Sequence, residues 1–482
     1  MNRLFIPTLS AGIIILIGLA ATSAGAAGPS ASHATSPEFS MCKSPYKKKP
    51  VPAKILQALV RSHEQWMEYR GNPDAKRIEL CQADLSRAAL AGANLERADL
   101  EGAVLRQAKL PQAILAQASL AGADLTKSVL IDSNLSGADL RYARLTDTNL
   151  SRAIGDEAAL FGAVLIDAKL KGASFERAQL QGADLTSADL TDSNFAEAYF
   201  YGATLKDTVL VNADLTGADL RRTILTNANL YRANLQGTLL DRTHLETARL
   251  IEADLEGAYL DETNLRGANL KRAILRGTDL RYADLQGADL HDADLEGANL
   301  EEAALVKVDV HSANLRMAIL YHAVLDEADF LDANLTRAVL IGAKGLHINF
   351  MNADLNEMYA PKSSFTHARF NRANLESSNF VGADLRGSNF SHADMTHANL
   401  QETDLQETNL QNATLVHADL SGARLDSADL RLTNFKGAIL SSVIGLTQTQ
   451  LNAACVDDKT KLPPELSRPA PCSPPAKKRA KP

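Results

Sequence analysis

Carboxylates and imidazoles recur at a fixed spacing in the middle of this 482-residue chain. Asp289, Asp309 and Asp329 are each 20 residues apart, and His291 and His311 repeat at the same interval. If the chain returns to one side every 20 residues, these carboxylates align and repel unless a cation lies between them. Calcium or magnesium would use the aspartates, and zinc or copper would recruit the histidines. Weak divalent-cation binding is therefore one hypothesis, but aspartate belongs to the repeat itself, so we predict a hydrated surface and no metal or cofactor.

The four cysteines lie outside the regular part of the chain or at its edge. They are Cys42, Cys81, Cys455 and Cys472. Four cysteines allow three pairings, of which proximity along the chain favours Cys42–Cys81 and Cys455–Cys472. Each bridge would stabilise the fold by about 3–4 kcal/mol in the loop-entropy model. The alternative is four free thiols in a reducing cytosol.

Catalytic motifs are missing from the sequence. It contains no HExxH, no GxSxG, no Walker loop and no CxxC pair. We therefore predict that the chain is not an enzyme and has no catalytic residues.

A five-residue repeat must position the side chains named above. From Ile78 to Ser442 every residue number divisible by five is a central position, and 58 of these 73 positions are leucine. Neither an α-helix nor a flat strand gathers every fifth residue on one side. A chain that turns a corner every five residues does so, and four corners close a coil of about 20 residues. The repeats imply about 18 coils, or roughly 85–90 Å at about 4.8 Å per coil.

Glycine and short polar residues support the corners. Of the 28 glycines, 20 lie two residues after a central position, as Gly287 and Gly297 do, where a turn needs φ > 0. Asp or Asn precedes 39 of the 73 central residues and can bond to the turn backbone. Residues 283–300, ADLQGADLHDADLEGANL, resemble the A(D/N)LxG consensus of the pentapeptide-repeat family. The resemblance implies an all-β solenoid, a right-handed quadrilateral β-helix.

The amino terminus predicts export. Residues 1–26 combine Arg3, an apolar stretch from Ala11 to Ala20 and an Ala24-Gly25-Ala26 site, which is typical of a Sec-type signal peptide. An uncleaved membrane anchor is the alternative. Residues 27–50 are rich in Pro, Ser and Lys and are expected to be a flexible linker. The expected location is periplasmic or secreted.

Both ends of a solenoid need caps, because its terminal coils expose leucines and unpaired edges. At residues 51–77 we expect a helical cap in which Ile55, Leu59 and Trp66 share the buried face. At residues 443–472 we expect a short helix, opened by a Thr447–Gln450 capping box, inside a disulfide-closed cap. Residues 473–482 read as a disordered basic tail.

Phenylalanine replaces leucine in one interior column. Phe330, Phe350, Phe370 and Phe390 occupy it in consecutive coils, and offset stacking adds about 0.5–1.5 kcal/mol per pair. Within the coil 343–362, Gly345 and Ala360 stand where leucine is expected. We expect Ala360 to face Phe350 across the coil and conserve core volume, the alternative being a bulged binding loop.

Gly155 also interrupts the leucine series. The expectation there is that Ile154 turns inward in place of the missing side chain.

The net charge of the repeat region favours neither DNA mimicry nor a nucleic-acid partner. Residues 78–442 carry a net charge of −18, flanked by +6 and +4. Some pentapeptide-repeat proteins resemble a DNA duplex and protect DNA gyrase, which makes DNA mimicry an alternative function. B-DNA of this length carries roughly 50 phosphates, and gyrase is cytoplasmic. We expect instead an exported structural or interaction scaffold whose partner, a protein or cell-envelope material, the sequence does not identify.

Overall fold

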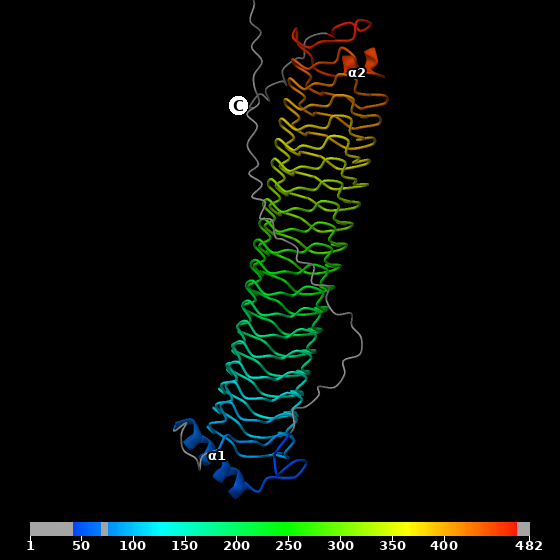
Figure 1. Ribbon diagram of the computed structural model, residues 1–482. Coiled ribbons are helices and arrows are strands. Elements are labelled where there is room, and N and C mark those ends of the chain that lie inside the picture. Colours follow the sequence, from blue (N-terminus) through cyan, green and yellow to red (C-terminus); the bar gives the residue numbers. More distant parts are fainter. Residues whose placement is uncertain (1–41, 69–75, 470–482) are drawn as a thin grey trace, which may run out of the picture. The chain divides into compact units, whose positions relative to one another are not determined.

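Parallel bridges join each residue before a central position to the residue 20 places further on. The computed structural model describes residues 42–68 and 76–469, and the bridges keep this interval from Glu79–Asp99 to Arg424–Ile444. Four pentads therefore complete each coil, and the fold is a quadrilateral β-helix whose coils stack from the α1 end to the α2 end (Figure 1). Every described residue belongs to one compact unit, Phe39–Pro482.

Regular secondary structure is sparse because the chain turns every five residues. In the part of the chain that the structure describes, the helices are α1 (Ala53–Glu68) and α2 (Gln448–Asn452). The coil walls contain isolated bridges and no longer strands, since each side of a coil contributes a single bridging residue.

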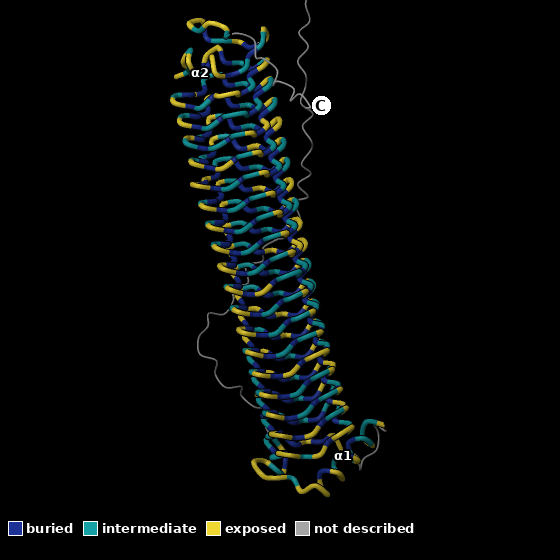
Figure 2. The backbone as a smooth tube through the Cα atoms, turned by 180° about the vertical axis from the view of Figure 1, so that it is seen from behind, coloured by how far each residue is buried: buried dark blue, intermediate teal, exposed yellow. Residues whose placement is uncertain are grey.

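The central residues form the core, as the five-residue period predicts. Leu285, Leu290 and Leu295 are fully buried, and so are the small residues two places before them. Figure 2 shows buried residues alternating with exposed and intermediate ones along each coil. The outward surface is therefore built from the remaining three positions of each pentad.

The pentad that starts at Leu290 pairs all five of its backbone amides. Four of these amides bond backbone carbonyls at 2.7–3.0 Å; they belong to Leu290, Asp292, Ala293 and Asp294. The fifth, that of His291, donates to Oδ1 of Asp289 at 3.2 Å. The Asp or Asn of the repeat thus accepts a hydrogen bond from the one amide that has no backbone carbonyl partner.

The phenylalanine column packs as predicted. Ring centroids are 5.1 Å apart between Phe330 and Phe350, 5.0 Å between Phe350 and Phe370, and 4.5 Å between Phe370 and Phe390. The coil 343–362 keeps the bridge interval on both sides of Tyr359, so the bulged-loop alternative is wrong.

Glycines in the core are compensated along the column. A Cβ on Gly155 would lie 2.2 Å from Cε1 of Phe175, and one on Gly345 would lie 3.3 Å from Cδ1 of Phe365. Each ring comes from the next coil of the same column and fills the space. The expectation that Ile154 turns inward is wrong, because Ile154 is 46 % exposed.

At the amino-terminal end, the chain before α1 pairs with the first coil. Lys47 bridges Ala83 and Pro50 bridges Asp84, so this segment covers part of the open edge. The buried residues of α1 are Leu56, Val60 and His63. The predicted face of Ile55, Leu59 and Trp66 is therefore wrong by about one position: Ile55 is exposed, whereas Leu59 is half-buried and packs against the core.

His63 joins α1 to the coils. Its Nδ1 accepts a hydrogen bond from the amide of Ile78 at 3.1 Å, and its Nε2 lies 2.8 Å from the carbonyl oxygen of Glu96. The imidazole is therefore neutral, with its proton on Nε2. Trp66 stacks on this ring at 5.5 Å between centroids.

At the carboxyl-terminal end, the bridge interval lengthens. Asn434 pairs with Cys455 and Ile439 with Lys461, because α2 is inserted into the last coil. The predicted capping box is present: the Thr447 side chain accepts from the Gln450 amide, and the Gln450 side chain accepts from the Thr447 amide. Leu451 of α2 is buried.

Several predicted segments lie outside the described residues. They are the signal peptide 1–26, most of the linker 27–50 and the tail 473–482. Neither helix among the described residues is long and apolar enough to cross a bilayer.

Candidate functional site

The turns determine how the coils present outward side chains. The second residue after each central position from Leu80 to Phe435 has a positive φ, +66° at Gly287 and +58° at Asp292. A Cβ on Gly287 would meet nothing within 4 Å, so glycine is favoured there by backbone conformation and not by space. Outward side chains therefore form columns in which neighbours are 20 residues apart.

The acidic file exists as predicted, but its ligand atoms are engaged. Asp289, Asp309 and Asp329 are bridged neighbours, and the rings of His291 and His311 lie 4.8 Å apart. Oδ1 of each aspartate accepts the backbone amide two residues further on.

Neighbouring side chains close both ends of this file. Lys271 Nζ lies 3.1 Å from Oδ2 of Asp289, and Asn349 Nδ2 donates to Asp329 at 2.7 Å. Over residues 42–68 and 76–469, no group of three or more His, Cys, Asp or Glu side chains is arranged to hold a metal ion. The geometry offers the cation hypothesis no specific support.

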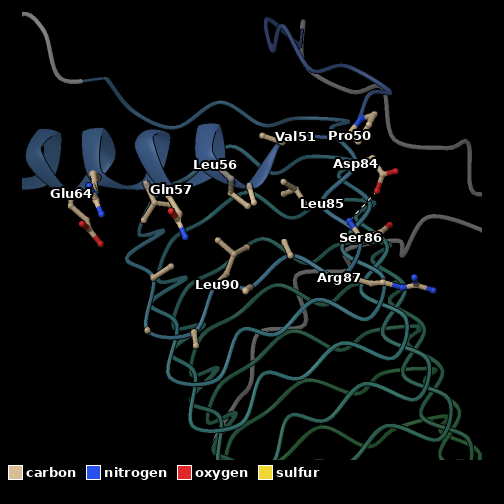
Figure 3. A pocket seen from close by; sticks show the side chains of 18 residues that line it. Pro50, Val51, Leu56, Gln57, Glu64, Asp84, Leu85, Ser86, Arg87 and Leu90 are labelled. Carbon is tan, nitrogen blue, oxygen red and sulfur yellow. Dashed lines mark hydrogen bonds between the residues drawn. The ribbon is translucent and has the colours of Figure 1, made fainter.

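A cavity lies between α1 and the first coil. It has a volume of about 650 Å³, with Leu56, Leu85 and Leu90 on its walls and Glu64 and Arg87 among its polar residues (Figure 3). The size suits a small ligand.

The polar groups of this cavity do not converge on its interior. Asp84 accepts from the Ser86 amide at 2.9 Å, and hydrogen bonds from Ser86 hold the pKa of the Asp84 carboxyl below its usual value. Sequence reasoning missed this cavity, because it depends on where the helix packs.

One side of the coils is rich in tyrosine. Two columns of outward side chains make up this side. One runs from Ser119 to Asn399 and the other from Ala121 to Gln401, both in steps of 20. We call these columns, together with the corner residue that follows each pair, the tyrosine face. Seven of the eight tyrosines between residues 78 and 442 lie on it: Tyr142, Tyr199, Tyr201, Tyr259, Tyr282, Tyr321 and Tyr359. Tyr231 is the exception.

Phe161 lies on the tyrosine face as well, and it is the only phenylalanine of residues 78–442 outside the central positions. Phe161, Tyr199 and Tyr359 are between 43 % and 46 % exposed. Large aromatic rings gathered on one exposed face are typical of interaction surfaces. Sequence reasoning missed this face, although sorting outward residues by their position within 20 would have found it.

Charged residues of the tyrosine face form local pairs. Arg221 Nη2 lies 2.7 Å from Oδ2 of Asp219, and Arg281 makes the same contact with Asp279. These contacts show that the two columns lie side by side. Burial raises the pKa of the Asp241 carboxyl, although a hydrogen bond from the Asp261 amide acts in the opposite direction.

A disulfide ties the amino-terminal segment to the first coil. Cys42 and Cys81 are bonded, with their Cα atoms 5.7 Å apart, in agreement with the pairing expected from the sequence. Cys455 is also disulfide-bonded. Cys472 lies outside the described residues, so the Cys455–Cys472 pairing stays a prediction.

Similar proteins share the repeat. HetL from Nostoc sp., a pentapeptide repeat protein involved in heterocyst differentiation regulation, is 29 % identical over 47 % of this chain and 91 % of its own, with a TM-score of 0.34. A pentapeptide repeat protein of the Arabidopsis thaliana thylakoid lumen is 29 % identical over 22 % and 70 %, with a TM-score of 0.18. The plasmid-mediated fluoroquinolone resistance protein QnrB1 is 18 % identical over 41 % and 89 %, with a TM-score of 0.23.

The repeat sequence carries the family assignment. No curated protein matches the chain. The family model of pentapeptide repeats, in contrast, matches successive segments from residue 83 to residue 441. Because these segments make up most of the chain and coincide with the bridged coils, the chain belongs to the pentapeptide-repeat family.

Proposed function

We propose that the protein is an exported, non-enzymatic scaffold that presents its coil faces to a protein or to cell-envelope material. The observation that carries this proposal is the unbroken 20-residue register, which holds outward side chains in fixed columns over hundreds of residues. Since every coil bonds to its neighbours through backbone amides, these columns keep their spacing without a ligand.

The finer parts of the proposal concern the coils and their ends. The β-helix is right-handed, as in the family, with about 18 coils of about 4.8 Å each. The segment containing α1 and the segment containing α2 protect the two ends from pairing with other chains. The Cys42–Cys81 bridge supports export, because disulfides persist in oxidising compartments.

Location and processing test the export half of this proposal. Native protein from fractionated cells should have an amino terminus near Ala27 and should be absent from the cytosol. A cytosolic protein that begins at Met1 would contradict export.

Partner capture tests the scaffold half. Immobilised full-length protein with intact disulfides should retain a partner from the envelope fraction, whereas reduced and unfolded protein should not. Purified DNA gyrase provides the competing test, and protection of its supercoiling activity against a fluoroquinolone would favour the DNA-mimic alternative. Acidic residues such as Asp219 and Asp279 already pair with arginines, unlike the continuous phosphates of a duplex.

A further inference from the structure

The tyrosine face contains two uncharged patches. The first patch is Ala159, Phe161, Gln179, Gln181, Tyr199 and Tyr201. The second patch is Ile319, Tyr321, Val339, Ile341, Tyr359 and Pro361. Within the two columns of the tyrosine face, neither patch contains a charged residue, although most outward positions of the repeat are polar.

A charged band separates these patches. In the column that starts at Ala121, this band consists of Arg221, Asp241, Asp261, Arg281 and Glu301, one residue per coil. The two patches lie three to five coils from the coil of Asp261, on opposite sides of it. The face therefore has the same order of apolar and charged zones when it is followed from either end.

We propose that the tyrosine face is the interface of an antiparallel homodimer whose two-fold axis passes through the coil of Asp261. Such an axis reverses the coil order and keeps each column opposite its own copy, as an isologous contact requires. Arg221 then faces Glu301 of the second copy, and Asp241 faces Arg281. Each of these pairs occurs twice in the dimer.

The apolar patches also meet under this symmetry. Tyr201 faces Tyr321 of the second copy, and Phe161 faces Pro361. These rings lie toward the two ends of the contact, where aromatic rings that pack against one another contribute to its stability. Burial already raises the pKa of Asp241, so a guanidinium placed opposite it would stabilise the charged carboxylate.

Charge selects this alignment among its competitors. In a parallel dimer the two-fold axis runs along the coils and exchanges the two columns. Arg221 and Arg281 would then meet Asp219 and Asp279, but Asp241 would oppose Leu239 and Glu301 would oppose Asn299, so these two carboxylates would face no cation. Moving the antiparallel axis half a coil toward Asp241 places Asp241 opposite Asp261 and Arg221 opposite Arg281. Moving it the other way places Asp241 opposite Glu301. Like charges at an interface suppress such registers.

The available area suits a dimer of moderate affinity. The coils from Phe161 to Pro361 span about 50 Å at about 4.8 Å per coil, and one side of a coil is roughly 12 Å wide. Each copy would contribute about 600 Å², and the total of roughly 1,200 Å² is at the lower edge of specific interfaces. The other sides of the coils stay free for the proposed partner, so this inference does not depend on the proposed function.

A charge swap tests the interface. Sedimentation of the full-length, oxidised protein from about 1 to 200 μM should show a monomer–dimer equilibrium with a dissociation constant in the micromolar range. Arg281→Asp and Asp241→Arg should each weaken it by about tenfold or more, and the double variant should restore it. Arg276→Asp is the matched control, because Arg276 occupies the same pentad position on a neighbouring side and also pairs with an aspartate, Asp294.

The aromatic contact and the axis provide second tests. Tyr201→Ala should weaken the dimer and Tyr231→Ala should not, since Tyr231 has the same pentad position on another side. Asp261→Asn should tighten the dimer, because two copies of Asp261 meet at the axis. A wild-type protein that stays monomeric throughout, a double swap variant as weak as its single parents, or an Arg276→Asp effect equal to that of Arg281→Asp would each overturn the proposal.

Discussion

Within each pentad, some residues are buried in the core and others form hydrogen bonds to the backbone. The central leucine and the small residue before it are buried, as at Leu290 and Ala288. Asp289 looks like a potential metal ligand in the sequence, yet it accepts the amide of His291. The need to pair this amide explains why aspartate is frequent at this position of the repeat, without any bound ligand.

Burial predicts a large difference between inward and outward substitutions. Leu290→Ala should lower the free energy of unfolding by about 2–5 kcal/mol, because it leaves a cavity among packed coils. Gln286→Ala, an outward change one pentad earlier, should stay within about ±0.5 kcal/mol. Chemical denaturation measures both, and equal effects would contradict the inward assignment of the central positions.

Restoring the consensus at Gly155 should be harmful. Gly155→Leu should lower the free energy of unfolding by about 1–3 kcal/mol, because any Cβ there overlaps the ring of Phe175. The double variant Gly155→Leu with Phe175→Leu should recover most of this loss in the same denaturation experiment. Failure of the second substitution to rescue the first would show that the two positions do not share one space.

At the scale of elements, α1 depends on a neutral histidine. His63 is buried, and burial lowers its pKa from the ordinary 6.5, with a further contribution from Arg77. The unfolded chain therefore takes up this proton at a higher pH than the folded chain does. The stabilisation is complete above pH 6.5 and is lost progressively as the pH falls through 6.5 toward the lower folded pKa.

Acid should loosen α1 before it affects the coils. Protonation of Nδ1 would break the hydrogen bond from Ile78, so the fluorescence of Trp66, the single tryptophan, should change as the pH falls below 6.5. His63→Ala should remove this transition while the circular dichroism of the coils stays constant. An unchanged transition in that variant would assign it to another group.

At the scale of the whole molecule, the coils form a continuous column stabilised between neighbours, and the ends are its weak points. At the carboxyl-terminal end the bridge interval changes at Asn434, which pairs with Cys455 because α2 enters the last coil. At the other end, residues 47–50 bridge the first coil and the Cys42–Cys81 disulfide holds their segment in place. Stability should therefore be lowest where these end segments detach.

Reduction should act locally. Replacing Cys42 and Cys81 by alanine should lower the stability of the amino-terminal end by about 3–4 kcal/mol, because the bridge closes a 39-residue separation. Compared with the wild type, hydrogen exchange should be faster in α1 and the first coils and unchanged in the coils around Leu290. A uniform change along the whole column would mean that the disulfide supports all coils together.

The sequence by itself determined the coil, because an unbroken five-residue period admits one inward direction and one 20-residue register. It also identified the phenylalanine column and the Thr447–Gln450 capping box, both of which depend on local spacing. Tertiary structure alone decided which side of α1 is buried, since Leu56 rather than Ile55 meets the first coil. It also decided how Gly155 is filled: the space belongs to Phe175 of the next coil, a neighbour in the column and not in the chain. The cavity beneath α1 likewise depends on packing between segments, which the order of residues within each segment does not encode.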